Sequence, residues 1–355
     1  GMGDAVDRDC EIVELTNTLP LLHRLEGSHI NIDELDYLAR RLDGFDVVEV
    51  VQFQAMADKW KLTDMKDLIN LTFCCQEATV ITDFSDLEAV GRNHYMNTHG
   101  GCASAEELDN LDGEETAILL IEDNEGTITR YGVVYDNGMQ LSQIYDGKHL
   151  PCYHYEADMT AVGISSRWEP ENSRNVTWIY LPAAKGQIER ALQRAGIRNP
   201  ADLSLWMGDS LFPTEIDVAL DFRHEDIYDL NGLAKAVKRL SNDDRMKLGA
   251  VVGMVQPKYA YQICRLAENL DMFEFAPGTH TPAEYGKFMI QQSGHFDYDP
   301  NLDEFYDYER YGRQHMDSES GMFTDRGYIA YVGVESLEEL MGEGQEQVKG
   351  GMEMQ

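Results

Sequence analysis

The amino-acid sequence predicts an α+β fold of several domains, in which small α/β domains alternate with helical-bundle domains. Three observations support this prediction. The chain has 355 residues, enough for two or three domains. Its residues are 43% hydrophobic and 10% aromatic, which allows real cores and argues against a disordered acidic chain. Finally, the sequence repeats internally, and each half reads as helices followed by a short strand-bearing piece.

The repeat becomes visible when the sequence is compared with itself at an offset of 195 positions. Similar residues then coincide without a gap over roughly a hundred positions. The matched pairs are Leu35 with Leu230, Leu38 with Leu233, Ala39 with Ala234, Ala55 with Ala250, Leu68 with Ile263, Gly91 with Gly286, Gly126 with Gly321 and Gly132 with Gly327. A coincidence between two helical periodicities is the alternative explanation.

Both halves of the repeat begin with amphipathic helices. Apolar residues at helical spacing predict three helices between residues 32 and 71, the third of them capped by Thr63. Ser85–Glu88 then forms a capping box, in which the serine and the glutamate each satisfy a backbone donor. Its counterpart Thr281–Glu284 lies one position further along and has proline at the first helical position.

A strand-bearing piece follows each group of helices. In the first half, residues 104–107 open a short helix, and residues 117–138 predict a β-hairpin that turns near residues 124–126. In the second half we expect a helix from about Asp303 to Met316 and a strand over 327–333.

A different unit separates the two halves, with strands predicted over 176–182 and 215–222 and a helix over 185–197. The predicted organisation is an N-terminal segment (1–29), a helical domain (30–98), a small α/β domain (99–138), an α/β domain (139–224), a second helical domain (225–292), a second small α/β domain (293–334) and a flexible acidic tail (335–355).

Charge is the most unusual property of the chain, with 64 acids against 29 bases and a formal net charge of -35. This sign argues against plain binding to nucleic acids or anionic membranes and favours a basic partner surface. No apolar run is long enough to span a membrane. The six cysteines form no C-x-x-C pair and no secretory signal precedes them, which predicts reduced thiols in the cytoplasm.

The sequence contains no recognised catalytic motif, so we expect no enzyme activity, no cofactor and no metal. His94, His99 and Cys102 are the best metal candidates, but their spacing fits no standard zinc site. Cys152 and His154 alternate on one predicted strand, a poor arrangement for a catalytic pair. An unrecognised site in 139–224 is still an alternative; a pocket that gathers these two residues and His149 would favour it.

Acidic and aromatic residues interleave in the stretch 295–312, which holds six carboxylates and six aromatic rings against one arginine. Rings supply much apolar area per residue, so a short element can fold while its outer face stays acidic. We expect Phe305, Tyr308 and Gly312 to point inward and Asp303, Glu304 and Asp307 outward. An ordinary solvated acidic face is the alternative. The candidate acidic surface comprises Asp297, Asp299, Asp303, Glu304, Asp307, Glu309, Glu106, Glu107, Asp109, Asp112, Glu114 and Glu115.

The sequence contains the motifs "EAVGRNHYM", "AEYGKFMIQ", "FYDYERYGRQHM" and "TDRGYIAYVG". Together these motifs resemble the ArdA antirestriction proteins of conjugative plasmids and transposons. The resemblance is best over residues 177–333, where 177–224, 227–292 and 295–333 follow the family's order of α/β, helical and terminal α/β domains. This chain is about twice the typical family length, and its first half, at 30–138, lacks a clear first domain.

The resemblance implies an elongated DNA mimic without catalytic residues, which occupies the DNA-binding cleft of type I restriction-modification enzymes and dimerises through its terminal domain. The twelve carboxylates above would then be a DNA-mimicking surface. Duplex DNA carries about one charge per 1.7 Å, so 35 charges correspond to roughly 60 Å of duplex, about 17 base pairs. The alternative is a non-catalytic acidic scaffold or regulator of a conjugative element that binds another basic protein.

Overall fold

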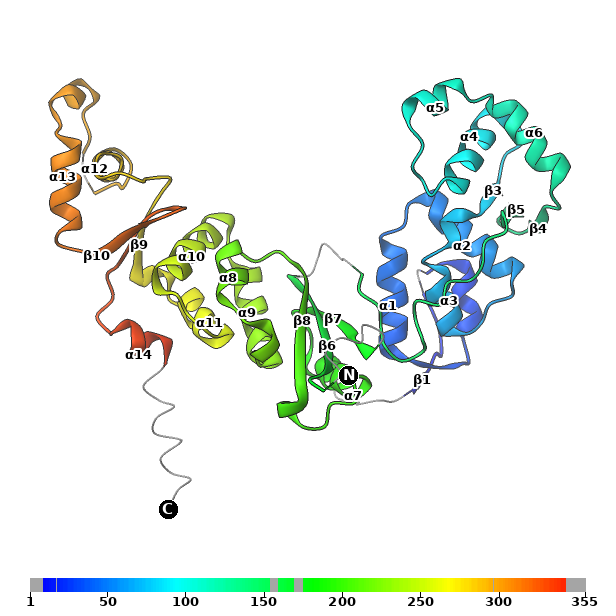
Figure 1. Ribbon diagram of the computed structural model, residues 1–355, viewed down its shortest axis with the longest axis horizontal. Helices are drawn as coiled ribbons and strands as arrows, with labels where there is room; N and C mark the ends of the chain where they lie inside the picture. The colour runs from blue at the N-terminus through cyan, green and yellow to red at the C-terminus, as the bar shows by residue number, and fades with distance from the viewer. Residues whose placement is uncertain (1–8, 17, 154–158, 169–174, 296, 343–355) are drawn as a thin grey trace, which may run out of the picture. The chain divides into compact units, whose positions relative to one another are not determined.

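The computed structural model, shown in Figure 1, describes residues 9–16, 18–153, 159–168, 175–295 and 297–342. The chain folds into two compact units. Unit 1 comprises Gly1–Tyr155, Glu171–Trp178 and Lys185–Arg198, and unit 2 comprises Glu156–Pro170, Ile179–Ala184 and Asn199–Gln355. Helices and small antiparallel sheets occur in both, which confirms the α+β prediction. The region 139–224, predicted as one domain, is divided between the two units.

Unit 1 contains a helical body, a two-stranded sheet β1-β2 and a three-stranded sheet β3-β5-β4. Its elements are β1 (Asp9–Glu11), η1 (Pro20–Leu25), β2 (His29–Asn31), α1 (Ile32–Asp43), α2 (Val47–Lys59), α3 (Met65–Leu71), η2 (Cys75–Glu77), β3 (Thr79–Ile81), α4 (Leu87–Thr98), α5 (Ala105–Asn110), α6 (Gly113–Asp123), β4 (Thr127–Thr129), β5 (Gly132–Tyr135) and α7 (Lys185–Arg194). Apolar side chains at helical spacing, among them Leu38, Phe53 and Met56, are fully buried in its core.

Unit 2 contains two three-stranded sheets, ordered β7-β6-β8 and β10-β11-β9, and a second helical body. Its elements are β6 (Thr160–Ser166), β7 (Thr177–Leu181, whose last three residues belong to this unit), η4 (Pro200–Asp202), β8 (Leu203–Ser210), α8 (Thr214–Ala219), η5 (Phe222–His224), α9 (Ile227–Arg239), α10 (Asn242–Val255), α11 (Ala260–Glu268), η6 (Leu270–Met272), β9 (Phe273–Pro277), α12 (Pro282–Gln291), η7 (Pro300–Phe305), α13 (Tyr308–Met316), β10 (Ser320–Thr324), β11 (Gly327–Tyr331) and α14 (Leu337–Met341).

Residues 32–135 of unit 1 and 227–331 of unit 2, called here the N-terminal and C-terminal modules, share one plan. Seven pairs of helical elements begin 195 residues apart, namely α1 and α9, α2 and α10, α3 and α11, η2 and η6, α4 and α12, α5 and η7, and α6 and α13. Sheet pairing follows the same offset. Ile81 faces Val133 as Ala276 faces Tyr328, and Thr129 faces Gly132 as Thr324 faces Gly327.

Helix capping differs in two places from the sequence prediction. Asp64, and not Thr63, caps α3, and Asp86, and not Ser85, caps α4. Aspartate competes well with serine and threonine at this position, because its carboxylate accepts from the backbone N–H groups of the first turn. With Asp86 as the cap, α4 comes into register with α12, whose cap is Thr281.

Three predicted elements are wrong. Residues 117–123 belong to α6, so the hairpin is shorter and joins β4 to β5 at Arg130 and Tyr131. The strand predicted over 215–222 contains α8 and η5 instead. The helix predicted from Asp303 is split into η7 and α13. Short apolar runs fit both the helical and the strand period, so periodicity alone could not separate these cases.

The C-terminal tail begins with structure rather than flexibility. Ser336 and Glu339 form a capping box for α14, and Leu340 and Met341 are buried. α14 packs against α11. The expectation of a flexible tail from residue 335 is therefore wrong for 337–341, while residues 343–355 lie outside the described part.

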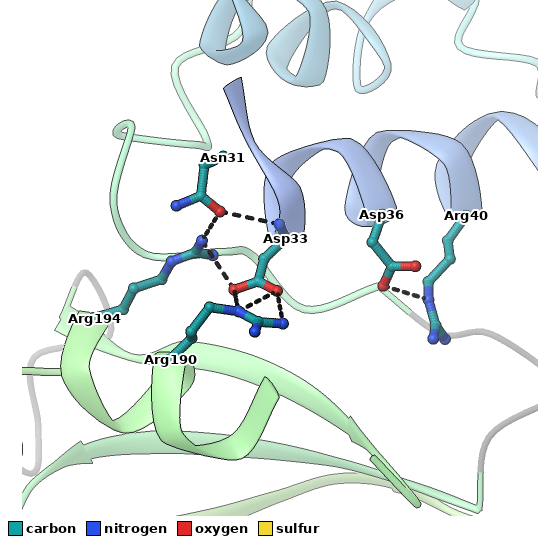
Figure 2. Close-up of polar contacts among 6 residues, drawn as sticks. All are labelled: Asn31, Asp33, Asp36, Arg40, Arg190 and Arg194. Atoms are coloured by element: carbon teal, nitrogen blue, oxygen red, sulfur yellow. Dashed lines mark hydrogen bonds and ion pairs between the residues drawn. The ribbon is translucent and has the colours of Figure 1, made fainter. Parts of the chain in front are cut away.

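A buried ion cluster attaches α7 to α1 within unit 1 (Figure 2). The Arg190 guanidinium donates to both carboxylate oxygens of Asp33, with Nη2–Oδ1 at 2.7 Å and Nε–Oδ2 at 2.8 Å. Arg194 Nη2 lies 3.2 Å from Asp33 Oδ2, and both arginine side chains are at most 10% exposed. The hydrogen bonds from Arg190 to Asp33 raise the pKa of that guanidinium. One carboxylate of α1 thus contacts two arginines of α7.

Glu225 is a buried acid that predicts a pH-dependent stability of unit 2. Burial, together with the nearby Asp229 and Asp221, raises its pKa to about 7, against the effect of the hydrogen bond accepted from the Ala260 N–H at 3.0 Å. A raised folded-state pKa contributes stability below the unfolded value of 4.5, and this contribution is lost as pH rises through 7. We expect Glu225→Gln to raise the free energy of unfolding by about 2 kcal/mol at pH 8.

Calorimetry of the wild type and the Glu225→Gln variant at pH 5 and pH 8 checks this prediction. The stabilisation should shrink toward zero at pH 5, where the native carboxyl is already protonated. Equal differences at both pH values would contradict the assignment.

Candidate protein-interaction surface

Two acidic segments carry about half of the net charge. The N-terminal acidic segment, residues 83–125, holds twelve acids and one base, and the C-terminal acidic segment, residues 278–320, holds nine acids and three bases. Their net charges of -11 and -6 account for 17 of the 35 excess negative charges within a quarter of the chain. The two segments occupy corresponding positions in the two modules.

Each segment is built on two helices in close contact. Figure 1 shows α4 beside α6 in unit 1 and α12 beside α13 in unit 2. Glycine makes this approach possible, because a Cβ at Gly91 would meet the carbonyl of Gly113, and a Cβ at Gly286 would meet the carbonyl of Tyr308. The tight pairing places the starts of the second helices, which are rich in acids, at the surface.

Carboxylates at the helix starts also serve as caps. Asp112 accepts from the Glu115 N–H at the start of α6, and Asp307 accepts from the Arg310 N–H at the start of α13. Hydrogen bonds from the backbone N–H and hydroxyl of Ser104 lower the pKa of Glu107. These bonds hold the charges in defined places at helix N-termini, where the helix dipole favours them.

Eleven of the twelve predicted surface carboxylates are exposed. Three exposed pairs occupy corresponding positions in the two segments: Asp109 and Glu304, Asp112 and Asp307, and Glu114 and Glu309. Within each segment the structure brings the acids together on neighbouring short elements. Sequence reasoning missed further exposed acids in the N-terminal segment, namely Asp83, Asp86, Glu88, Glu122, Asp123 and Glu125. A helical reading of 113–123 would have placed Glu122 with Glu115 on one face.

Asp303 is the exception. Its carboxylate accepts hydrogen bonds from Gln291 Nε2 and Tyr298 Oη, each at 2.8 Å, and from the hydroxyl of Tyr308. The hydrogen bond from Tyr308, followed by that from Tyr298, lowers the pKa of Asp303. The expected outward orientation is therefore wrong, and Asp303 holds η7 against α12. Phe305, expected inside, is 82% exposed.

Of the residues weighed as catalytic or metal-binding, His94, His99 and His149 make other contacts, while Cys102 and Cys152 are exposed. His94 Nδ1 lies 3.0 Å from the Thr79 hydroxyl, and burial lowers the pKa of His94. His99 stacks on Tyr95 at 3.9 Å between ring centroids. His149 pairs with Asp146, and His154 lies outside the described residues. In the described part of the chain, no three His, Cys, Asp or Glu side chains are grouped to hold a metal.

The cavity beside the N-terminal acidic segment is small. It measures about 190 Å³, lies between α2, β3 and α4, and is lined by residues such as Gln52, Thr79 and Asn93. Ligand sites usually measure 300–1,000 Å³. The described features thus define an acidic α+β protein with exposed carboxylates, some of which cap helices. Within the described residues, no helix combines the length and apolar character needed to cross a membrane.

Comparison with known proteins supports a narrower class. Residues 173–330 match the model of a family described as antirestriction protein (ArdA). The match covers 158 of the 355 residues, less than half of the chain, and includes the C-terminal module with its acidic segment. This segment is similar to the ArdA family, which confirms the resemblance found in the sequence. A search of curated proteins returned no match.

Proposed function

We propose that this protein is an antirestriction protein that occupies the DNA-binding cleft of type I restriction-modification enzymes in place of duplex DNA. The observation that carries the proposal is the ArdA match over 173–330, the same segment in which Asp297, Glu304 and Glu309 are exposed. A cleft that binds duplex is lined by lysine and arginine, so an acidic ligand gains the same release of counterions. The mechanism requires no bond-making step and no cofactor.

We also infer that the N-terminal module arose by duplication of the C-terminal one. The common offset of 195 residues in helix starts and in sheet pairing supports this inference. Exposed acids at corresponding positions, such as Asp109 and Glu304, support a contribution of both modules to target binding. An elongated shape, a cytoplasmic location and a homodimer through the terminal α/β domain, as the family implies, are parts of the same proposal.

A competition assay tests the function. The wild-type protein should displace duplex DNA from a type I enzyme, and its inhibition should weaken steeply as salt rises. The structure indicates which carboxylates to neutralise: Asp303 and Asp307 support the fold, whereas Glu106, Asp109, Asp297 and Glu304 have exposed side chains outside the caps. Replacing these four by their amides should raise the inhibitory concentration about ten- to a hundredfold, at up to about 1 kcal/mol for each charge pair.

A matched control removes four exposed acids elsewhere, by amide substitution at Glu14, Glu77, Asp243 and Asp271. It leaves the same net charge and should inhibit nearly as well as the wild type. If both variants weaken equally, net charge rather than the acidic segments is responsible. Failure of the wild type to compete with DNA at any salt concentration would reject the proposed function.

A further inference from the structure

Phe305 projects from the C-terminal acidic segment with 82% of its surface exposed. It is the most exposed aromatic side chain among the residues that the structure describes. Leu302, on the same short helix η7, is 46% exposed. Single exposed apolar residues are common on protein surfaces. Neighbouring exposed apolar residues among polar ones are more typical of an interaction site. Attraction between this acidic segment and a basic partner would not by itself require an exposed ring.

The short helix that carries Phe305 is fixed to the rest of the C-terminal module by aromatic contacts and hydrogen bonds. Tyr298 and Tyr306 lie 6.1 Å apart between ring centroids, and Tyr306 and Tyr308 lie 5.8 Å apart. The Asp303 carboxylate accepts from two of these tyrosines and from Gln291 on α12. The backbone that carries Phe305 is therefore held before any partner binds, which reduces the entropic cost of using the ring in an interface.

The acids around Phe305 specify the chemistry of the partner. Asp299, Glu304 and Asp307 are exposed and flank the apolar pair along the chain. At the positions that correspond to Leu302 and Phe305, the N-terminal module carries the polar residues Glu107 and Asn110. An apolar residue flanked by carboxylates complements a hydrophobic pocket with basic residues beside it, and buried aromatic side chains are frequent hot spots of binding energy.

We infer that Phe305, assisted by Leu302, is an apolar anchor that enters a hydrophobic pocket in the basic DNA-binding surface of the restriction enzyme. This inference rests on the proposed function and adds to it. Phosphate mimicry gives an affinity that falls with salt, whereas burial of a ring gives a contribution that salt does not screen. The C-terminal module therefore binds through two separable components, and the N-terminal module has no counterpart of this anchor at the corresponding positions.

The test replaces Phe305 with asparagine, the residue at the corresponding position 110. The inhibition constant against a type I enzyme is measured at several salt concentrations. We expect about a tenfold or greater loss of affinity at every salt concentration, as for a hot-spot residue, with an unchanged slope of log affinity against log salt. Adding Leu302→Gln should deepen the loss. Phe305→Leu, which keeps an apolar side chain, should lose threefold or less, on the order of 0.6 kcal/mol.

Val218→Asn is the control, because Val218 is 86% exposed on α8, outside the acidic segment. It should bind as the wild type does. Equal affinity of Phe305→Asn and wild type, or a loss that disappears at high salt, would overturn the anchor while the proposed function stands. A wild type that fails to compete with DNA would overturn both.

Discussion

Replacing Asp33 with asparagine is expected to lower the free energy of unfolding of unit 1 by about 3 kcal/mol. The change leaves Arg190 and Arg194, each at most 10% exposed, without the carboxylate that both contact. Removing one partner of a buried ion pair is among the most costly changes that a single substitution can produce. Because the cluster joins α7 to α1, hydrogen exchange in α7 should also accelerate in the variant.

The same helix supplies a matched control. Asp36 contacts Arg40 one turn further along, with Nε–Oδ2 at 3.0 Å, and its side chain is 47% exposed (Figure 2). Asp36→Asn should therefore change the unfolding free energy by less than about 0.5 kcal/mol, since solvent screens an exposed pair. Chemical denaturation of the two variants gives the comparison. Similar losses for both would mean that the buried cluster contributes no more than a surface pair.

Gly286→Ala is expected to destabilise the C-terminal module by about 2–3 kcal/mol. The added Cβ would meet the carbonyl oxygen of Tyr308, and the Tyr308 carbonyl carbon and Gly312 nitrogen would lie 2.9 and 3.0 Å away. These are backbone atoms, so α12 and α13 have to separate. Inhibition should fall with stability, because α13 carries part of the acidic segment.

Gly232→Ala is the appropriate comparison for this substitution. Gly232 also lies within a helix, α9, but a Cβ there has no neighbouring atom within 4 Å. Alanine is the better helix former by up to about 1 kcal/mol, so this variant should be neutral or more stable. Thermal unfolding distinguishes the two. A stable Gly286→Ala variant would show that the helix pair has room that the structure does not indicate.

Much of the fold could be predicted because its signals are local. Capping at Ser104 and Thr281, the apolar periodicity of α1 and α9, and the strand at 327–331 were all visible in the sequence. The helix α8 was not predicted, because Ile216 and Val218 alternate with acidic residues as in a β-strand. In the structure, Ile216 is buried and Val218 exposed on one short helix. Six residues are too few for periodicity to separate the two cases.

The candidate site was predictable in composition but not in orientation. Exposure of acids such as Glu304 follows from the cost of burying charge. Asp303 escaped this rule because tyrosines and a glutamine from other elements satisfy its carboxylate. Phe305 was misplaced because a continuous helix would set it on the same face as Tyr308. The break between η7 and α13 means that Phe305 and Tyr308 do not belong to one continuous helix, so they need not share a face.

The matched register of the two small sheets has an evolutionary consequence. The strands β3, β4 and β5 pair in the same register as β9, β10 and β11. The stretch between β3 and β4 could therefore replace the stretch between β9 and β10 without a change in the register of either sheet. Under the proposed function, a gene with two such interchangeable stretches could change one acidic segment by recombination while it retained the other.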